Sequence, residues 1–144
     1  MTRFGYFLSS EEHGPSELVR QARLAEQAGF EALWISDHYH PWLDEQGESS
    51  FVWSVIGAIS QVSSLPVTTA VTCPIMRIHP AVIAQAAAAS AMLTKGKFIL
   101  GVGTGEALNE YPCTADWPDY YTRRDMVRES IDLMRLLWSG DEIT

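Results

Sequence analysis

Short apolar runs alternate with amphipathic segments along almost the whole of this 144-residue chain. Such alternation is typical of an α/β fold, because a strand that helices cover on both faces of a parallel sheet is apolar throughout. A helix that covers the sheet is apolar on one face only. The apolar runs predict four strands, at residues 3–8, 32–36, 67–72 and 97–102.

Prolines and glycines mark the ends of the intervening segments. Proline suits the first turn of a helix, and glycine suits the residue that follows one. We therefore expect helices at residues 15–28, 51–62, 80–95 and 122–139. Residues 110–121 are rich in Pro, Asp and aromatic side chains, and we expect them to form a loop.

Four β/α units fit two architectures. One is an open, doubly wound sheet and the other is part of a (β/α)8 barrel, since both use right-handed crossovers and place ligands at the carboxyl ends of their strands. The pattern alone does not separate them. A complete barrel needs about 250 residues, so a chain of 144 residues accommodates about half of one.

Composition excludes several classes of function. The chain has 10 Lys and Arg against 18 Asp and Glu, a formal charge of -8, and its basic residues form no run that could follow a phosphate backbone. We therefore expect no nucleic-acid partner. The longest apolar stretch, residues 81–93, is too short to cross a bilayer, so no membrane partner is expected. The two cysteines, Cys73 and Cys113, form neither a disulfide scaffold nor a zinc motif, which favours a cytoplasmic location.

Polar clusters follow three of the expected strands, at residues 36–42, 72–74 and 101–106. The carboxyl ends of parallel strands lie at one edge of a sheet, and this edge collects the functional site in α/β folds. Three clusters on one edge predict a site more strongly than any one of them alone. A small-molecule substrate is the expected ligand.

The first cluster pairs Asp37 with His38, and a histidine beside a carboxylate suits proton transfer near neutral pH. The alternative is a capping Asp and a surface His, but the place of the pair at the strand end favours a functional role. Trp42 is either a stacking partner or a core residue. The spacing of His38 and His40 resembles a metal-binding pair, yet no further ligand motif accompanies it, so no metal site is expected.

The third cluster contains three glycines and then Glu106. It is not a dinucleotide fingerprint, because the third glycine position is occupied by Glu106 and the segment does not follow the first strand. The glycines allow close approach of the backbone to a flat ligand, and Glu106 is a candidate proton donor. In the second cluster, Cys73 is interpreted as a small buried residue, since no base accompanies it.

Taken together, these clusters resemble the deazaflavin-dependent glucose-6-phosphate dehydrogenases of the luciferase-like family. The similarity covers nearly the whole chain, and it is carried by residues 36–38, 41–42, 79–85, 101–110 and 133–140. The resemblance implies a (β/α)8 TIM barrel of the luciferase-like type. Residues 1–144 would then be the N-terminal half of a single barrel domain, about four β/α units, with the C-terminal half absent.

The resemblance also implies coenzyme F420 as the cofactor, and hydride transfer between it and an alcohol-bearing substrate. His38 would be the active-site base, Glu106 the acid and Trp42 the residue that stabilises the intermediate. We expect the acid and the base to lie on opposite sides of the bound ring. The cofactor-binding positions would be Asp37, Ala70, Val71, Cys73, Thr104 and Asn109.

The chain departs from the family at two of these positions. The family has a Ser-Val pair joined by a non-prolyl cis peptide bond, where this chain has Ala70 and Val71, and a Thr where it has Cys73. Whether the bond between Ala70 and Val71 is cis or trans stays open, because a cis bond here costs several kcal/mol. The residues that bind the sugar phosphate lie in the later half of the barrel, so this substrate is not inferred.

Two alternatives remain. One is a luciferase-like monooxygenase that uses FMN and shares the same barrel. The other is an inactive half-barrel fragment whose open strand edges pair with another chain. In the full-length form we expect a homo-oligomer, a dimer. The chain alone is expected to be inactive and to self-associate.

Overall fold

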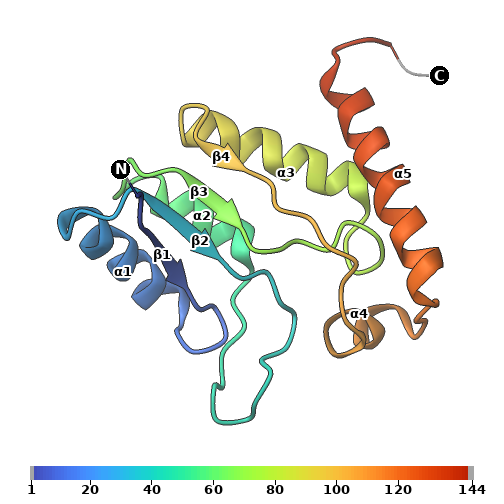
Figure 1. Cartoon of the computed structure of the whole chain (residues 1–144), viewed down its shortest axis with the longest axis horizontal. Helices are drawn as coiled ribbons and strands as arrows, with labels where there is room; N and C mark the ends of the chain where they lie inside the picture. The colour runs from blue at the N-terminus through green and yellow to red at the C-terminus, as the bar shows by residue number, and fades with distance from the viewer. Residues whose placement is uncertain (1, 143–144) are drawn as a thin grey trace.

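The computed structural model describes residues 2–142. Four parallel strands form one sheet in the order β1-β2-β3-β4. They are β1 (Gly5–Leu8), β2 (Ala32–Ile35), β3 (Val67–Thr69) and β4 (Phe98–Ile99). The helices are α1 (Pro15–Gln27), α2 (Val52–Ile59), α3 (Pro80–Leu93), α4 (Ala107–Thr114) and α5 (Tyr120–Trp138) (Figure 1). The predicted parallel α/β arrangement is therefore confirmed.

The main core lies between one face of the sheet and helices α1 and α2. Helix α1 buries Leu18, Ala22 and Ala25, which recur at the spacing of one helix face. Pro15 begins this helix, and it ends before Gly29, whose φ of +90° is readily adopted only by glycine. The fully buried residues of the sheet are Leu8, Leu33, Ile35, Val67 and Thr69.

A second core joins α3 to α5, which lie side by side (Figure 1). Ile83 and Ala84 of α3 pack with Met134 of α5, and Trp138 donates a hydrogen bond to the carbonyl oxygen of Ala84 at 3.1 Å. Asp119 caps α5 by accepting hydrogen bonds from two backbone N–H groups. None of the helices within residues 2–142 combines the length and apolar character that a membrane crossing requires.

The opposite face of the sheet is uncovered. Phe7 pairs with Trp34, Trp34 with Thr68, and Thr68 with Ile99, so these four residues form one row across the sheet. The exposed fractions of Phe7, Trp34 and Ile99 are 49%, 52% and 56%. In a closed barrel, alternate residues of each strand fill the interior. The row has the position of one such interior layer.

Strands β3 and β4 are shorter than predicted. Strand β3 ends at Thr69, and a cis peptide bond then joins Ala70 to Val71, as in the family that the sequence resembles. Pairing beyond this point is reduced to a single bridge between Thr72 and Val102. At Gly101, a Cβ atom would lie 2.1 Å from the carbonyl oxygen of Thr69, so only glycine fits where the two segments converge.

The loop predicted at residues 110–121 is partly wrong, because helix α4 occupies Ala107–Thr114. Pro112 lies inside this helix, and proline there normally argues against a helix. Buried polar contacts outweigh this preference: Asn109 and Glu110 in the first turn are almost fully buried and bonded to other segments. The helix ends at Thr114, and the next residue, Ala115, lies in the left-handed region with φ of 54°.

Candidate active site

The three polar clusters meet at the carboxyl end of the sheet, around a cavity of about 220 Å³. Its wall consists of Asp37, His38, Val71, Cys73, Gly103, Thr104, Gly105, Glu106, Asn109 and Glu110. The four strands are parallel, so the segments that follow them leave the sheet at this same end (Figure 1). The predicted convergence of the clusters is therefore observed.

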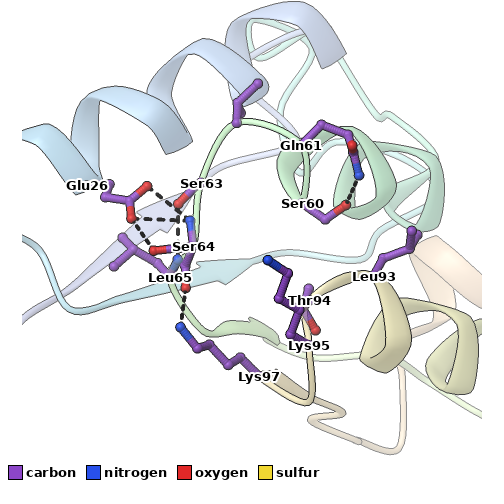
Figure 2. Close-up of a pocket in the computed structure, with 11 residues that line it drawn as sticks. Glu26, Ser60, Gln61, Ser63, Ser64, Leu65, Leu93, Thr94, Lys95 and Lys97 are labelled. Atoms are coloured by element: carbon purple, nitrogen blue, oxygen red, sulfur yellow. Dashed lines mark hydrogen bonds between the residues drawn. The ribbon is translucent and has the colours of Figure 1, made fainter.

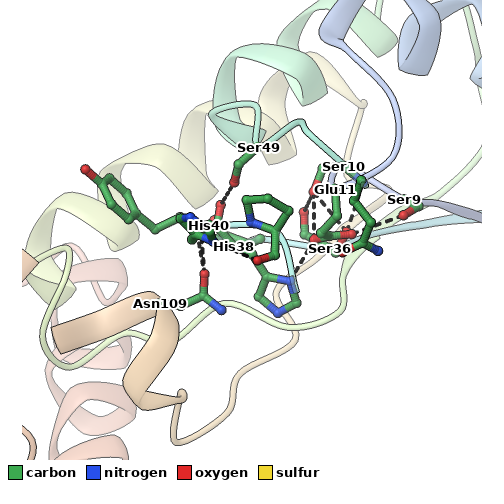
Figure 3. Close-up of polar contacts among 12 residues, drawn as sticks. Ser9, Ser10, Glu11, Ser36, His38, His40, Ser49 and Asn109 are labelled. Atoms are coloured by element: carbon green, nitrogen blue, oxygen red, sulfur yellow. Dashed lines mark hydrogen bonds and ion pairs between the residues drawn. The ribbon is translucent and has the colours of Figure 1, made fainter. Parts of the chain in front are cut away.

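His38 is held by a carboxylate that follows β1. Its Nδ1 lies 2.6 Å from Oε1 of Glu11 (Figure 3). The Glu11 side chain also accepts hydrogen bonds from the hydroxyl groups of Ser9, Ser10 and Ser36. Because an ionised carboxylate only accepts hydrogen bonds, Nδ1 carries a proton, and in the neutral ring Nε2 is left as the basic atom.

Charge and burial oppose each other in this pair. Burial alone would raise the pKa of Glu11, but hydrogen bonds from His38 and Ser36 lower that pKa to about 2. Burial alone would lower the pKa of His38. The hydrogen bond and charge of Glu11, with the charges of Glu106 and Asp37, outweigh it and raise the pKa above its usual value of 6.5. His38 therefore holds a proton readily.

Glu106 and Trp42 approach the exposed part of the His38 ring. Nε2 of His38 lies 3.9 Å from Oε1 of Glu106, and the ring of Trp42 meets the imidazole edge-on, with centroids 5.5 Å apart. An aromatic ring stacked between two groups needs about 3.5 Å on each side. A ring does not fit between His38 and Glu106 at this separation, and their placement on opposite sides of the bound cofactor stays a prediction.

Asp37 lines the cavity, but its carboxylate is buried and engaged by the protein itself. Oδ2 accepts a hydrogen bond from Thr72 at 2.7 Å, and Oδ1 accepts one from Nη2 of Arg77 at 2.9 Å. Arg77 also donates to the backbone carbonyl oxygen of Asp37. Asp37 thus shapes the wall of the cavity from a fixed position.

Asn109 links α4 to the segment after β2. Its Oδ1 accepts hydrogen bonds from the backbone N–H groups of Tyr39 and His40, each at 2.8 Å (Figure 3). Its Nδ2 donates to Oε2 of Glu106 at 3.4 Å. The predicted acid and the segment that carries the predicted base are therefore joined through one buried side chain.

The glycine cluster packs directly against the segment after β3. A Cβ atom on Gly103 would lie 2.7 Å from Cγ2 of Val71, and one on Gly105 would lie 2.5 Å from Sγ of Cys73. Gly105 also has a φ of +69°. Burial raises the pKa of the Cys73 thiol to about 12, with a further contribution from the charge of Glu110. Cys73 is therefore a protonated thiol in the wall, as its interpretation as a small buried residue predicted.

Most of the predicted site residues lie together. His38, Glu106, Asp37, Val71, Cys73, Thr104 and Asn109 line the cavity, whereas Ala70 and Trp42 do not. Three further residues were missed by the sequence analysis: Glu11, Arg77 and Glu110. Glu11 had a usable signal, since it is an acidic residue placed directly after the first strand. Arg77 had none, because its segment has no recognisable motif.

The pair His38 and His40 does not form a metal site in this arrangement. Nδ1 of His40 lies 2.7 Å from the backbone carbonyl oxygen of Pro41, while Nδ1 of His38 is bonded to Glu11. Among residues 2–142, no three His, Cys, Asp or Glu side chains are grouped so that they could hold a metal ion.

A second cavity, of about 360 Å³, lies at the other end of the sheet, next to the segments that precede β3 and β4 (Figure 2). There Glu26 accepts hydrogen bonds from the backbone and hydroxyl of Ser64, and Lys97 donates to the carbonyl oxygen of Ser64. These contacts tie loops together. Residues at the amino ends of barrel strands serve stability, and catalytic residues lie at the carboxyl ends, so we assign the site to the smaller cavity.

The chain is similar to proteins of known family. A family profile described as luciferase-like monooxygenase matches residues 1–144. The chain is 46% identical over 141 residues to an F420-dependent hydroxymycolic acid dehydrogenase of Mycobacterium tuberculosis, covering 97% of this chain and 39% of that protein. It is 41% identical over 145 residues to an F420-dependent glucose-6-phosphate dehydrogenase of Amycolatopsis mediterranei, covering 99% of this chain and 44% of the other.

A solved structure matches as well. It is an F420-dependent secondary alcohol dehydrogenase in complex with an F420-acetone adduct, with a TM-score of 0.95 and 40% identity, over 99% of this chain and 44% of that one. The chain thus spans about two fifths of the length of these relatives. Its four parallel strands correspond to the N-terminal half of their barrel, and the chain belongs to the luciferase-like family.

Proposed function

We propose that this chain supplies the acid–base half of the active site of an F420-dependent oxidoreductase, which transfers a hydride between an alcohol-type organic substrate and the deazaflavin. The observation that carries the proposal is the arrangement of His38. Its Nδ1 is fixed by Glu11 and its Nε2 lies beside Glu106 at the edge of the cavity. Three F420-dependent dehydrogenases at 40–46% identity support the choice of cofactor.

The wall of the cavity suits a flat ring. Gly103 and Gly105 bring the backbone against Val71 and Cys73, where a side chain would not fit. Val71, Cys73, Thr104 and the backbone around the glycines would hold one side of the ring. At about 220 Å³ the cavity is smaller than the roughly 300–1,000 Å³ usual for small-molecule sites. A complete pocket therefore needs wall residues beyond those of the described chain.

When bound, the deazaflavin supplies a ring carbon that accepts or donates a hydride, and it lacks the nitrogen through which reduced flavin reacts with oxygen. The residues of this chain then act on the proton of the alcohol. Nε2 of His38 takes this proton as the alcohol is oxidised, and returns it in the reverse direction. Glu11 fixes the ring orientation and stabilises the imidazolium that forms, as a carboxylate does behind a catalytic histidine.

Glu106 influences this proton transfer only indirectly, through the charge that it places beside His38. At 3.9 Å from Nε2 it is beyond hydrogen-bond reach, so it favours the imidazolium by charge. Trp42 lies edge-on to the imidazole and restricts the space beside it. The substrate oxygen would thus approach His38 between an anionic and an aromatic side chain.

The proposal is tested with a chimera in which this chain replaces the matching N-terminal part of the F420-dependent secondary alcohol dehydrogenase. We expect F420 to bind, seen by its fluorescence, and secondary alcohols to reduce it. His38→Ala is expected to reduce turnover by about 10²-fold or more while binding persists. His40→Ala, an exposed neighbour, is the control. A folded chimera that binds FMN and ignores F420 would favour the monooxygenase alternative.

A loss of F420 binding in His38→Ala, with turnover of the bound fraction unchanged, would make His38 a ligand and not a base. Glu106→Gln is measured in the same way. It keeps the size of the side chain and removes its charge, so turnover is expected to fall and binding to change little.

A further inference from the structure

Arg77 lies buried beneath the cavity, between two carboxylates. Its side chain is 7% exposed, and those of Asp37 and Glu110 are 1% and 2% exposed. Nη2 of Arg77 donates to Asp37, its backbone N–H donates to Oε2 of Glu110 at 2.9 Å, and its Nε lies 3.7 Å from Oε1 of Glu110. Removing one charge from such a buried cluster leaves the remaining charges less well compensated.

These contacts join three segments that are far apart in sequence. Asp37 follows β2, Arg77 lies between β3 and α3, and Glu110 belongs to the first turn of α4. Burial raises the pKa of Glu110 above its usual value, even though the hydrogen bond and charge of Arg77 oppose this. The cluster therefore depends on the cation between the two acidic side chains.

The first turn of α4 also carries the predicted acid. Glu106 is the residue that precedes the helix, and its backbone carbonyl oxygen accepts hydrogen bonds from the N–H groups of Asn109 and Glu110. A shift of this turn moves Glu106 with it. Two links hold the turn to the segment after β2: Asn109, bonded to Tyr39 and His40, and Glu110, bonded through Arg77 to Asp37.

We propose that Arg77 is a positioning residue of the candidate active site: by joining Asp37 to Glu110 it fixes the first turn of α4, and with it Glu106, beside His38. The catalytic consequence rests on the proposed function, whereas the geometric one does not. Arg77 touches neither the cavity nor His38, so it acts only through the residues that it holds.

The proposal has a signature that loss of stability alone does not produce. The groups that raise the pKa of His38 are Glu11, Glu106 and Asp37. If α4 shifts, Glu106 leaves and the pKa of His38 falls, while Glu11 stays bonded. Removing the positive charge of Arg77 has the opposite direct effect, since a nearby cation disfavours the imidazolium. A fall therefore reports the loss of a negative charge near His38 and not the loss of the cation. In a Glu106→Gln background the fall caused by Arg77→Met disappears if Glu106 is the group that moves, and it persists if Asp37 is the group that loses its charge.

The experiment is an NMR titration of the His38 imidazole in the 144-residue chain, for Arg77→Met and Arg77→Lys. Glu106→Gln sets the largest fall in the pKa of His38 that loss of Glu106 can cause, and the 40% exposure of Glu106 limits this fall because solvent screens its charge. Arg77→Met is expected to lower the pKa of His38 by at least half as much as Glu106→Gln does. Arg23→Met, at an exposed position of α1, is the control and should not change it.

Lysine keeps the charge but not the guanidinium, whose Nη2 donates to Asp37 while its Nε lies near Glu110, so Arg77→Lys is expected to give a smaller fall than Arg77→Met. A pKa of His38 that is unchanged or raised in folded Arg77→Met overturns the proposal. If that variant does not fold, Arg77→Lys decides in the same way: a fall supports positioning, and an unchanged value overturns it. Because no cofactor is present, a failure of F420 binding leaves this result intact.

Discussion

Replacement of Glu11 by Gln removes the charge behind His38 with little change in shape. At the position of Oε1, the Gln oxygen can accept the Nδ1 proton of His38 and the hydroxyl proton of Ser10. Its NH2 group then takes the place of Oε2 and donates to the hydroxyl groups of Ser9 and Ser36, which can rotate to accept. The hydrogen bonds are thus largely conserved and the electrostatic contribution is not. Burial of His38, which opposes its protonation, remains. We therefore expect the pKa of His38 to fall from above 6.5 to below it.

The magnitude follows from the pKa of Glu11. The difference between its usual value of 4.5 and the value of about 2, at roughly 1.4 kcal/mol per pH unit, corresponds to roughly 3 kcal/mol of favourable interaction of the Glu11 carboxylate with its surroundings. His38 is the first of the groups that lower this pKa. The same interaction also appears in the raised pKa of His38, so the two are counted once.

The effect on stability has a defined pH window. A lowered pKa of Glu11 stabilises the fold above pH 4.5, and this contribution is lost as the pH falls toward 2. A raised pKa of His38 stabilises the fold below pH 6.5, and this contribution is lost as the pH rises through the raised value. Glu11→Gln should therefore cost most, up to about 3 kcal/mol, between these limits, near pH 5.5, and less near pH 9.

The assay is urea unfolding at the two pH values, with the His38 pKa followed by NMR. Glu12→Gln removes a carboxylate from the neighbouring exposed position and is the matched control, with little effect expected at either pH. A Glu11→Gln variant that loses the same stability at both pH values, with the pKa of His38 unchanged, would refute the electrostatic account of the pair.

Two further predictions test the packing and the uncovered face. Gly105→Ala and Gly29→Ala both place alanine at a positive φ, but of these two glycines only Gly105 has neighbours within 4 Å of the added Cβ. Measured by urea unfolding, Gly29→Ala should lower the free energy of unfolding by about 1 kcal/mol and Gly105→Ala by about 2 kcal/mol more. Equal losses would contradict the close packing of Gly105 against Cys73. The 144-residue chain is expected to self-associate through the row of Phe7, Trp34 and Ile99. Sedimentation velocity should therefore show association that increases with concentration. Trp34→Lys should weaken this association, whereas the control Met92→Lys, at an exposed position of α3, should not. A monomer at all concentrations would contradict it.

Local sequence patterns were sufficient for the order of the elements, because each strand is apolar along its length and each of the long helices buries one face. They failed where distant contacts decide the structure. The segment from Glu110 to Tyr121 contains Pro112 and several aromatic side chains, and it was expected to be a loop. Helix α4 forms there because Asn109 and Glu110 are bonded to residues 33 to 70 positions away.

The same reason explains which site residues were found. His38 and Glu106 belong to motifs at strand ends, so their place on one edge of the sheet followed from the topology. Glu11 is 27 residues from His38 in sequence, and nothing in the spacing of the two indicates that they are bonded. Arg77 is 40 residues from Asp37 and 33 from Glu110, in a segment without regular secondary structure. Such partners are defined only by the folded chain.

The contacts that orient His38 are separate from the uncovered face of the sheet. On the carboxyl edge of the sheet, Glu11 is bonded to Ser36 and His38, and Asn109 to Tyr39 and Glu106. Arg77 is bonded there to Asp37 and Glu110. The row of Phe7, Trp34 and Ile99 lies on the uncovered face, and its side chains take no part in those hydrogen bonds. Covering that face would therefore complete the barrel interior and the remaining wall of the pocket without rearranging the acid–base groups. The geometry of His38 and Glu106 should accordingly be the same in the isolated chain and in the chimera, and only ligand binding should differ between them.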